Sequence, residues 1–387
     1  MANYDYEIVN GRKIRVRPKE TVSEIDKNGY FRRQPNHFTT PFGDGENDLK
    51  AEGNKRYRLV WAKLCHWSNR AAIVRELEGL EDQISVNMVE HAPHEKNLGW
   101  EYVYNENNID PVLGDQFLSE AYYRADDDYQ GRTTVPALID TATGKVVNND
   151  YNWLTTYFEV NFRPWHKKGA PELYPVELRE EIDKMNLWLF DNINNAVYRS
   201  SFSRSNEGHF DGVNTFYAAM DRLEKRLETN RFLFGDYVTD SDIRLYVTLA
   251  RLDIRYTAQL GETKHPLYTY KNLWGYAKEL WEIPAFKNNT FFADFAVPPA
   301  DAKGRIEGEE DGFRASTHYD LALPKIDWDA QWKVSTERAY LFSDPTHPIY
   351  LGNNRRFDID PTWYDLGAES PKKEEKETPP SCGCCCG

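Results

Sequence analysis

Cysteine is scarce in the body of this 387-residue sequence. Four of the five cysteines crowd into the last six residues, and only Cys65 lies where a folded core could hold it. A secreted protein would distribute its cysteines for disulfides, whereas Cys65 has no cysteine in the body to pair with. The sequence therefore argues against a disulfide scaffold. It predicts one functional cysteine in the folded body and a separate cysteine-rich tail.

Basic charge is also in short supply. Lysine and arginine number 48 against 62 aspartates and glutamates, which gives a formal net charge of −14. Surfaces that bind nucleic acid or anionic membranes need basic patches, because they release counterions or meet acidic lipid. We therefore expect no nucleic-acid partner.

Long apolar runs are absent as well. No stretch approaches the ~18 residues of a spanning helix, and residues 1–7 show neither the basic nor the apolar part of a signal peptide. We therefore expect a cytoplasmic protein with no membrane span. The length of the chain favours two domains, each large enough to bury a core.

The pattern around Cys65 predicts a strand, a thiol and a helix in succession. Residues 57–61 alternate as in a short strand that ends shortly before the cysteine. Residues 69–78 carry a helical stripe of apolar side chains, and Gly79 is placed as a stop. A second alternating run at residues 84–88 completes a strand–cysteine–helix–strand unit.

Two more strands and a helix follow after a long insertion. Residues 134–140 are strand-like and are entered through Pro136, which cannot donate to a ladder and is compatible with a cis bond. Residues 141–145 form a hairpin turn, and residues 150–158 can form a helix. This order predicts a thioredoxin-like α/β domain over residues 57–158.

The second domain is predicted to be all-helical. Apolar residues step by three and four from Leu178 to Ile193 and from Val213 to Leu227, and Thr239 with Asp242 is placed as a capping box. The predicted segments are an irregular N-terminal extension (1–56), the thioredoxin-like domain (57–158), a linker (159–175), the all-helical domain (176–295), an extension that wraps the fold (296–366) and a disordered cysteine-rich tail (367–387).

A cysteine that precedes a helix meets unpaired backbone N–H groups and the positive end of the helix macrodipole. Both stabilise a thiolate, so Cys65 is predicted to be a nucleophile near neutral pH. Trp67 and Arg70 follow on the same turn, and Arg70 adds positive field. The alternative is a buried, inert cysteine that acts as a small hydrophobic side chain.

Residues 64–70, Leu-Cys-His-Trp-Ser-Asn-Arg, resemble the Cys-Pro-Trp-Ala-His-Arg signature of the xi-class glutathione transferases, the glutathionyl-hydroquinone reductases. The likeness continues through Gly99-Trp100, residues 131–136 and the asparagine-rich run at residues 191–198, and covers roughly residues 28–295. The resemblance implies a thioredoxin-like domain followed by a glutathione-transferase-type helical domain, an enzyme of that superfamily, and a homodimer.

The implied activity is thiol-dependent reduction. The Cys65 thiolate would attack the sulfur of a glutathionyl-hydroquinone, release hydroquinone and keep the glutathionyl group as a mixed disulfide, which a second thiol resolves. The co-substrate would be glutathione or another low-molecular-weight thiol, and no metal or nucleotide is needed.

The resemblance also assigns roles to individual residues. Trp100 corresponds to the indole beside glutathione, Val135 to the residue whose backbone pairs with the tripeptide, and Arg132 could meet a carboxylate. Tyr198 and Tyr256 correspond to phenols that face the quinone ring. The predicted catalytic set is Cys65, Tyr198 and Tyr256, and the predicted thiol- and substrate-binding set is Trp67, Arg70, Trp100, Arg132, Val135, Pro136, Asp150 and Tyr151.

The signature departs from the family at several positions. His66, Ser68 and Asn69 stand where the family has proline, alanine and histidine, and His66 could activate Cys65 or cap the helix. Asp150-Tyr151 replaces a Glu-Ser pair that holds the glutamyl end of glutathione. Asp150 keeps a carboxylate for an ammonium group, whereas Tyr151 changes the size of the pocket.

Two other functions stay open at the level of sequence. One is a glutathione S-transferase that conjugates electrophiles, and the other is a non-catalytic thiol- or metal-binding protein that uses the tail. The soft ligands of the tail could bind Cu(I) or Zn(II), but their spacing matches no closed zinc site; lipidation, a resolving thiol and an exposed tag are the rival roles. The tail cysteines are Cys382, Cys384, Cys385 and Cys386.

Overall fold

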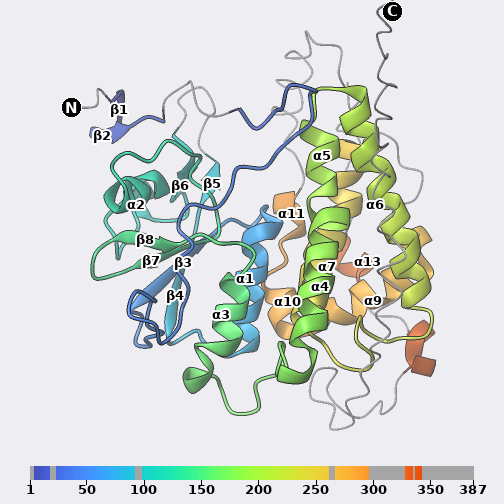
Figure 1. Ribbon diagram of the computed structural model, residues 1–387. Helices are drawn as coiled ribbons and strands as arrows, with labels where there is room; N and C mark the ends of the chain where they lie inside the picture. The colour runs from blue at the N-terminus through green and yellow to red at the C-terminus, as the bar shows by residue number, and fades with distance from the viewer. Residues whose placement is uncertain are drawn as a thin grey trace, which may run out of the picture.

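The computed structural model describes residues 4–17, 23–91, 98–260, 266–295, 327–333 and 336–341. A layer built on a β-sheet stands beside a layer of helices (Figure 1). No helix in these ranges combines the length and the apolarity needed to cross a bilayer. The cysteine-rich tail and its predicted roles lie outside the described residues.

The central sheet has the strand order β4-β3-β7-β8. β3 pairs in parallel with β4 and antiparallel with β7, and β7 pairs antiparallel with β8. This arrangement confirms the predicted thioredoxin-like fold. The four strands are β3 (Tyr57–Trp61), β4 (Ile84–Met88), β7 (Ala137–Asp140) and β8 (Lys145–Asn148).

Helices cover both faces of the sheet. Leu59 and Leu138 belong to the same core as Ile73 of α1 (His66–Leu77) and Phe158 of α3 (Leu154–Val160). The opposite faces of the same strands belong to a second core, which includes side chains of α2 (Leu118–Ala125). Every residue of β3 is therefore buried, including Arg58.

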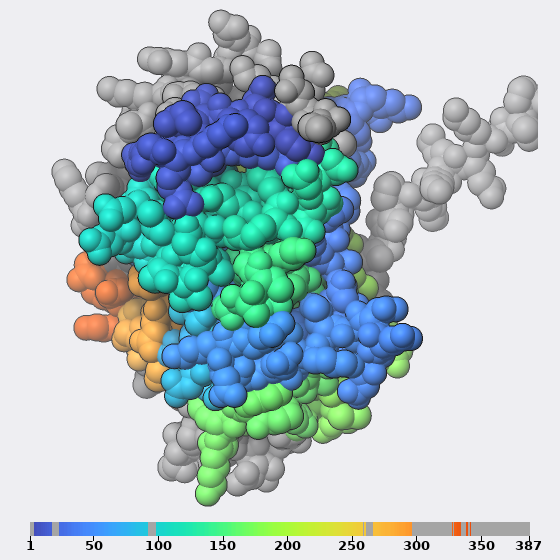
Figure 2. Space-filling model, turned by 90° about the vertical axis from the view of Figure 1, so that its left-hand side faces the viewer, coloured from blue at the N-terminus to red at the C-terminus, as the bar shows by residue number. Residues whose placement is uncertain are grey.

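The N-terminal extension contains a hairpin that the sequence analysis missed. The strands β1 (Tyr6–Val9) and β2 (Arg12–Arg15) pair across Asn10-Gly11, and both turn residues have positive φ angles of 52° and 78°. Asn-Gly is the preferred sequence for such a two-residue turn, so the signal was present. The hairpin sits on the surface formed around α2 (Figure 2), where Arg12 forms an ion pair of 3.0 Å with Glu120. A second small pair, β5 (Glu90–His91) and β6 (Trp100–Glu101), lies in the predicted insertion.

A segment that we call the N-terminal strap (residues 23–38) joins the two layers (Figure 1). On the helical side, the amide of Arg204 donates to the carbonyl of Gly29 over 2.6 Å, and the amide of Phe31 donates to Ser203 Oγ over 3.0 Å. On the sheet side, Phe38 exchanges hydrogen bonds with Asn149. The strap is therefore hydrogen-bonded to both layers.

The helical layer is organised around α7, all of whose residues are buried. Thr239 and Asp242 form the predicted capping box, in which the amide of Thr239 donates to Asp242 Oδ2 over 2.8 Å. The longer helices are α4 (Arg179–Leu189), α5 (Ala196–Phe202), α6 (Asn206–Arg226), α7 (Asp240–Arg251) and α9 (Lys271–Trp281); the shorter ones are α8 (Thr257–Leu260), α10 (Pro284–Asn288), α11 (Phe292–Phe295) and α13 (Trp328–Gln331). Short 3₁₀ segments lie at Glu106–Asn108, Arg163–Trp165, Val176–Leu178, Leu267–Thr269 and Thr336–Leu341. The π-helical turns are η5 (Phe190–Asn194) and η6 (Leu252–Tyr256).

The described part of the C-terminal extension does more than wrap the surface. Trp332 is buried against Trp274 and Phe292, and Arg338 is buried beside Glu279 with 3.1 Å between their charged groups. The guanidinium of Arg338 also donates to the backbone carbonyls of residues 227, 230 and 231. These two side chains tie residues 327–333 and 336–341 to the helical layer.

Candidate functional site

Cys65 occupies the N-cap position of α1, directly before the first helical residue. Its side chain is buried at 8% exposure, and its Sγ lies 3.7 Å from the backbone carbonyl oxygen of Val135. The Val135–Pro136 bond is cis, as the sequence had suggested. The predicted succession of strand, thiol and helix is confirmed, with α1 beginning three residues earlier than predicted.

Ser68 and Asn69, two of the departures from the family signature, hold the turn that carries Cys65. The hydroxyl of Ser68 lies within 3.3 Å of the backbone of Ala62, which precedes the turn, and of the carbonyl of Cys65. The side-chain amide of Asn69 donates to the carbonyl of Asn289 over 2.8 Å. Both side chains therefore form hydrogen bonds with backbone groups and not with the Cys65 thiol.

Two buried arginines flank the thiol. Arg251, at the end of α7, donates to the carbonyls of Lys63 and Leu64 over 2.8 and 2.9 Å and to Asn69 Oδ1 over 3.1 Å. Arg70 donates to the carbonyl of Tyr151. Burial, followed by the charge of Arg244, lowers the pKa of Arg70 to about 9, so Arg70 stays cationic at neutral pH. Both arginines interact electrostatically with Cys65.

His66 faces the helical layer. Its Nδ1 lies 3.1 Å from Thr248 Oγ1 of α7, and the side chain of the N-cap residue Cys65 makes no capping hydrogen bond. Burial lowers the pKa of His66 well below its usual 6.5, and the charges of Arg251, Arg33 and Arg70 lower it further. The imidazole is therefore neutral at physiological pH.

This buried imidazole predicts a specific pH dependence of stability. Below about pH 6.5 the unfolded chain binds a proton at His66 that the folded chain cannot bind, so the free energy of unfolding falls as the pH falls. His66→Gln removes this component, which amounts to at most about 1.4 kcal/mol per pH unit. Denaturant unfolding of both proteins between about pH 7.5 and pH 5.5 measures the difference. If the free energy of unfolding depends on pH equally in the two proteins, His66 takes up its proton in the folded chain as readily as in the unfolded chain, and the prediction is wrong.

Aromatic rings form a wall beside Cys65. The Trp67 ring centroid lies 4.8 Å from that of Tyr151, 5.5 Å from that of Phe190 and 5.8 Å from that of Tyr198. The rings of Tyr198 and Tyr256 lie 6.2 Å apart. The wall thus contains Trp67, Tyr151 and both tyrosines that the sequence had placed at the substrate.

Two π-helical turns lie next to the tyrosines of the wall. Turn η5 ends just before the helix that carries Tyr198, and Tyr256 is the last residue of η6. A π-helical turn inserts an extra residue, rotates the side chains that follow, and is frequent at functional sites. Burial raises the pKa of Tyr198, and the charge of Cys65 raises it further; burial and Tyr198 raise the pKa of Tyr256. Both phenols are therefore protonated and able to donate hydrogen bonds at neutral pH.

Of the remaining predicted residues, Arg132 and Asp150 contact the strap. Trp100 is buried, and its Nε1 donates to the carbonyl of Thr133 over 3.1 Å. Arg132 does meet a carboxylate, but it is that of Glu24 in the strap, which accepts two hydrogen bonds of 2.8 Å from the guanidinium. Asp150 Oδ1 accepts from the side-chain amide of Asn36, also in the strap, over 2.8 Å.

The sequence analysis missed two residues of this region, Arg33 and Arg251. Arg33 reaches Asn195 across 162 positions of the chain, and Arg251 reaches Leu64 across 187. No local pattern marks contacts of that separation. Within the described ranges, no group of three or more His, Cys, Asp and Glu side chains is arranged to hold a metal ion.

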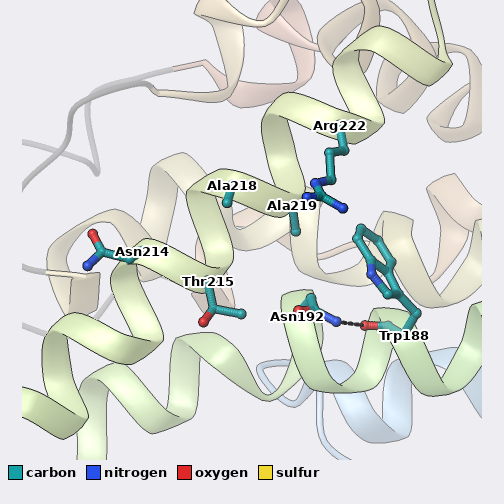
Figure 3. Close-up of a pocket in the computed structure, with 7 residues that line it drawn as sticks. All are labelled: Trp188, Asn192, Asn214, Thr215, Ala218, Ala219 and Arg222. Atoms are coloured by element: carbon teal, nitrogen blue, oxygen red, sulfur yellow. Dashed lines mark hydrogen bonds between the residues drawn. The ribbon is translucent and has the colours of Figure 1, made fainter. Parts of the chain in front are cut away.

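A separate pocket of about 260 Å³ lies in the helical layer (Figure 3). It opens between α6 and the junction of α4 with η5, where the side-chain amide of Asn192 donates to the carbonyl of Trp188 over 2.8 Å. None of the predicted site residues lines it. The lining residues are Trp188, Asn192, Asn214, Thr215, Ala218, Ala219 and Arg222.

Comparisons with known proteins agree with the fold. The family model of the glutathione S-transferase C-terminal domain matches residues 197–279. The chain is 34% identical over 277 residues to glutathione S-transferase omega-like 2 of Schizosaccharomyces pombe, covering 69% of this chain and 87% of that protein. It is 33% identical over 237 residues to glutathionyl-hydroquinone reductase YqjG of Escherichia coli, covering 61% of this chain and 72% of that protein.

Solved structures give the same result. The xi glutathione S-transferase of Phanerochaete chrysosporium matches with a TM-score of 0.64 and 33% identity, covering 70% of this chain and 88% of that chain. The glutathione-bound structure of Escherichia coli YqjG matches with a TM-score of 0.61 and 31% identity, covering 70% of this chain and 88% of that chain. The thioredoxin-like sheet, the helical layer and these relatives together show that the chain belongs to the xi-class glutathione transferase and glutathionyl-hydroquinone reductase family.

Proposed function

We propose that this protein is a thiol-dependent reductase of the glutathionyl-hydroquinone type, with Cys65 as its nucleophile. The observation that carries the proposal is the place of Cys65 at the start of α1, between the carbonyl of Val135 and the buried cations Arg70 and Arg251. Helix N-termini and neighbouring guanidinium groups stabilise the anionic form of a nucleophilic thiol. Relatives named as glutathionyl-hydroquinone reductases support the same reaction.

The proposed reaction has two steps. The Cys65 thiolate attacks the sulfur of the conjugate, the bond between that sulfur and the ring carbon breaks, and the ring carbon takes up a proton to give the hydroquinone. The glutathionyl group stays on Cys65 as a mixed disulfide. A second thiolate then attacks the glutathionyl sulfur, which forms the low-molecular-weight disulfide and restores Cys65.

The tyrosines of the wall supply hydrogen-bond donors for the ring. Tyr198 and Tyr256 stay protonated because burial raises the pKa of both phenols. A phenol beside the ring stabilises negative charge on a quinone oxygen while the carbon–sulfur bond breaks. We therefore propose that Tyr198 and Tyr256 position and polarise the ring.

The thiol co-substrate is proposed to lie along the sheet side, beside Trp100, Val135 and Asp150. The bound glutathione in the structure of the Escherichia coli relative supports glutathione as this thiol. Tyr151 packs on Trp67 at 4.8 Å and narrows the space where the family has a serine. The glutamyl end of the thiol is therefore the part whose recognition differs most from that of the family.

A product assay separates this reaction from conjugation. We expect a glutathionyl-hydroquinone incubated with the protein and free glutathione to yield hydroquinone and glutathione disulfide in equal amounts. A protein that instead joins glutathione to an aromatic electrophile, and releases no hydroquinone from the conjugate, is a conjugating transferase. Liquid chromatography of the quenched reaction quantifies all of these products. The same assay on a chain that ends at residue 366 tests the tail, because unchanged turnover excludes a required tail thiol.

A further inference from the structure

The strap inserts a cation into the aromatic wall. The guanidinium carbon of Arg33 lies 4.6 Å from the centroid of the Trp67 ring and 4.5 Å from that of Tyr198. Its Nε donates to Asn195 Oδ1 over 2.9 Å, so the side chain is fixed on the helical side of the wall. A guanidinium at these distances from ring faces gains cation–π attraction.

Arg33 lacks the carboxylate partner that two other arginines at the strap have. Arg132 is paired with Glu24 and Arg32 with Asp26, whereas Arg33 forms no ion pair with any described residue. Its Nη2 is shielded from solvent and has no hydrogen-bond partner among the described residues. A shielded cation with an unsatisfied donor is costly unless an anion or another acceptor joins it.

Asn195 and Tyr198 place this donor on the side of the wall where the aromatic part of a conjugate is proposed to lie. The thiol part is proposed to lie on the sheet side, where the strap engages Arg132 and Asp150 through other residues. An acceptor for Arg33 would therefore belong to the aromatic part of the substrate. A carboxylate fits, because guanidinium groups bind carboxylates strongly and with defined geometry.

We propose that Arg33 is a specificity-determining residue that binds a carboxylate on the aromatic ring, so that the preferred substrates are acidic aromatic thiol conjugates. The proposal rests on the reductase function proposed above and adds the chemical class of the ring. It assigns the strap a role in substrate choice, because Arg33 is the strap residue whose charge faces the wall without a carboxylate.

Two matched glutathionyl-hydroquinones test the proposal, one with a ring carboxylate and one with its methyl ester. Arg33→Gln is expected to lower kcat/KM for the acid about 10- to 100-fold and to change that for the ester little, since it removes one charged hydrogen bond. Arg33→Lys should recover part of the loss. The control is Arg32→Gln, which removes an exposed charge of the same strap and should affect neither substrate.

Equal losses with acid and ester would overturn the proposal, because Arg33 would then only close the wall. A loss that appears as a higher KM for free glutathione would overturn it too, because Arg33 would then bind the thiol. Thermal melting of each variant verifies that the strap still folds.

Binding separates this proposal from the reductase function. Calorimetry measures the affinities of the wild type and Arg33→Gln for two unreactive ligands. These are the glutathione thioethers S-(4-carboxybenzyl)glutathione and S-benzylglutathione. A carboxylate preference in the wild type that Arg33→Gln abolishes supports Arg33, even if neither hydroquinone conjugate is turned over and the reductase function fails. The absence of any preference in the wild type overturns the role of Arg33, even if the reductase function holds.

Discussion

Replacing Cys65 by alanine should lower the rate of thiol-dependent hydroquinone release by roughly 10³-fold or more, because the nucleophile that accepts the glutathionyl group is removed. Melting temperature should change little, since Cys65 contributes one small buried side chain. The measurement is kcat/KM for a glutathionyl-hydroquinone at saturating free thiol.

The tail provides the matched control for this variant. Serine at all four tail cysteines removes every other thiol of the chain while leaving Cys65 in place. We expect this variant to keep the wild-type rate. A chain in which Cys65→Ala is fully active and the tail variant is not would place the chemistry in the tail, which is the alternative that the sequence left open.

Replacing Arg251 by methionine should lower the free energy of unfolding by about 3 kcal/mol or more. The guanidinium is fully buried and donates to the carbonyls of Lys63 and Leu64 and to Asn69 Oδ1, and each acceptor would lose its partner away from water. These acceptors belong to the turn that carries Cys65. Activity should therefore fall even where the variant remains folded.

Chemical denaturation measures the change in the free energy of unfolding. The rate of Cys65 alkylation, measured without denaturant and well below the melting temperature, reports whether the turn that carries Cys65 is intact. The control is Arg255→Met, which alters a partly exposed arginine of the neighbouring π-helical turn. A stability of Arg251→Met equal to that of the control would mean that water replaces the guanidinium at the two carbonyls. The proposed clamp between α7 and the cysteine turn would then be wrong.

The local elements of this fold could be predicted because their signals are local. Apolar spacing located β3, α1 and β4, and the capping box at Thr239 located the start of α7. The hairpin at Asn10-Gly11 also has a local signal, the Asn-Gly turn sequence, but its strands are short and lie in a polar segment. Helix α2 was missed because it lies in a polar insertion, although one of its faces is buried.

The residues of the candidate site likewise fall into those that local sequence patterns mark and those that they do not. The nucleophile, its helix and the cis-proline loop lie within or beside local sequence patterns, and in the structure Cys65 lies against the carbonyl of Val135. The strap and Arg251 act over separations of more than 100 residues, and no spacing rule reaches that far. Arg132 shows the consequence, since its carboxylate partner is Glu24 of the strap and could not be read from the residues beside it.

The altered signature acquires a physical explanation from the helical layer. His66 meets Thr248, and Asn69 meets Asn289 and Arg251, so two of the three substituted positions contact helices of the second layer. Ser68 instead holds the backbone of its own turn. The substituted residues therefore affect mainly the contacts that position the cysteine turn, and not the atoms next to the thiol.

The most direct test of the account is a single turnover without free thiol. We predict that the tail-serine variant, mixed with excess glutathionyl-hydroquinone, releases one equivalent of hydroquinone per chain and gains the mass of one glutathionyl group on the peptide that contains Cys65. Added glutathione should remove that mass as glutathione disulfide. Release of hydroquinone with an unmodified Cys65, or no release until glutathione is added, would contradict the proposed nucleophile.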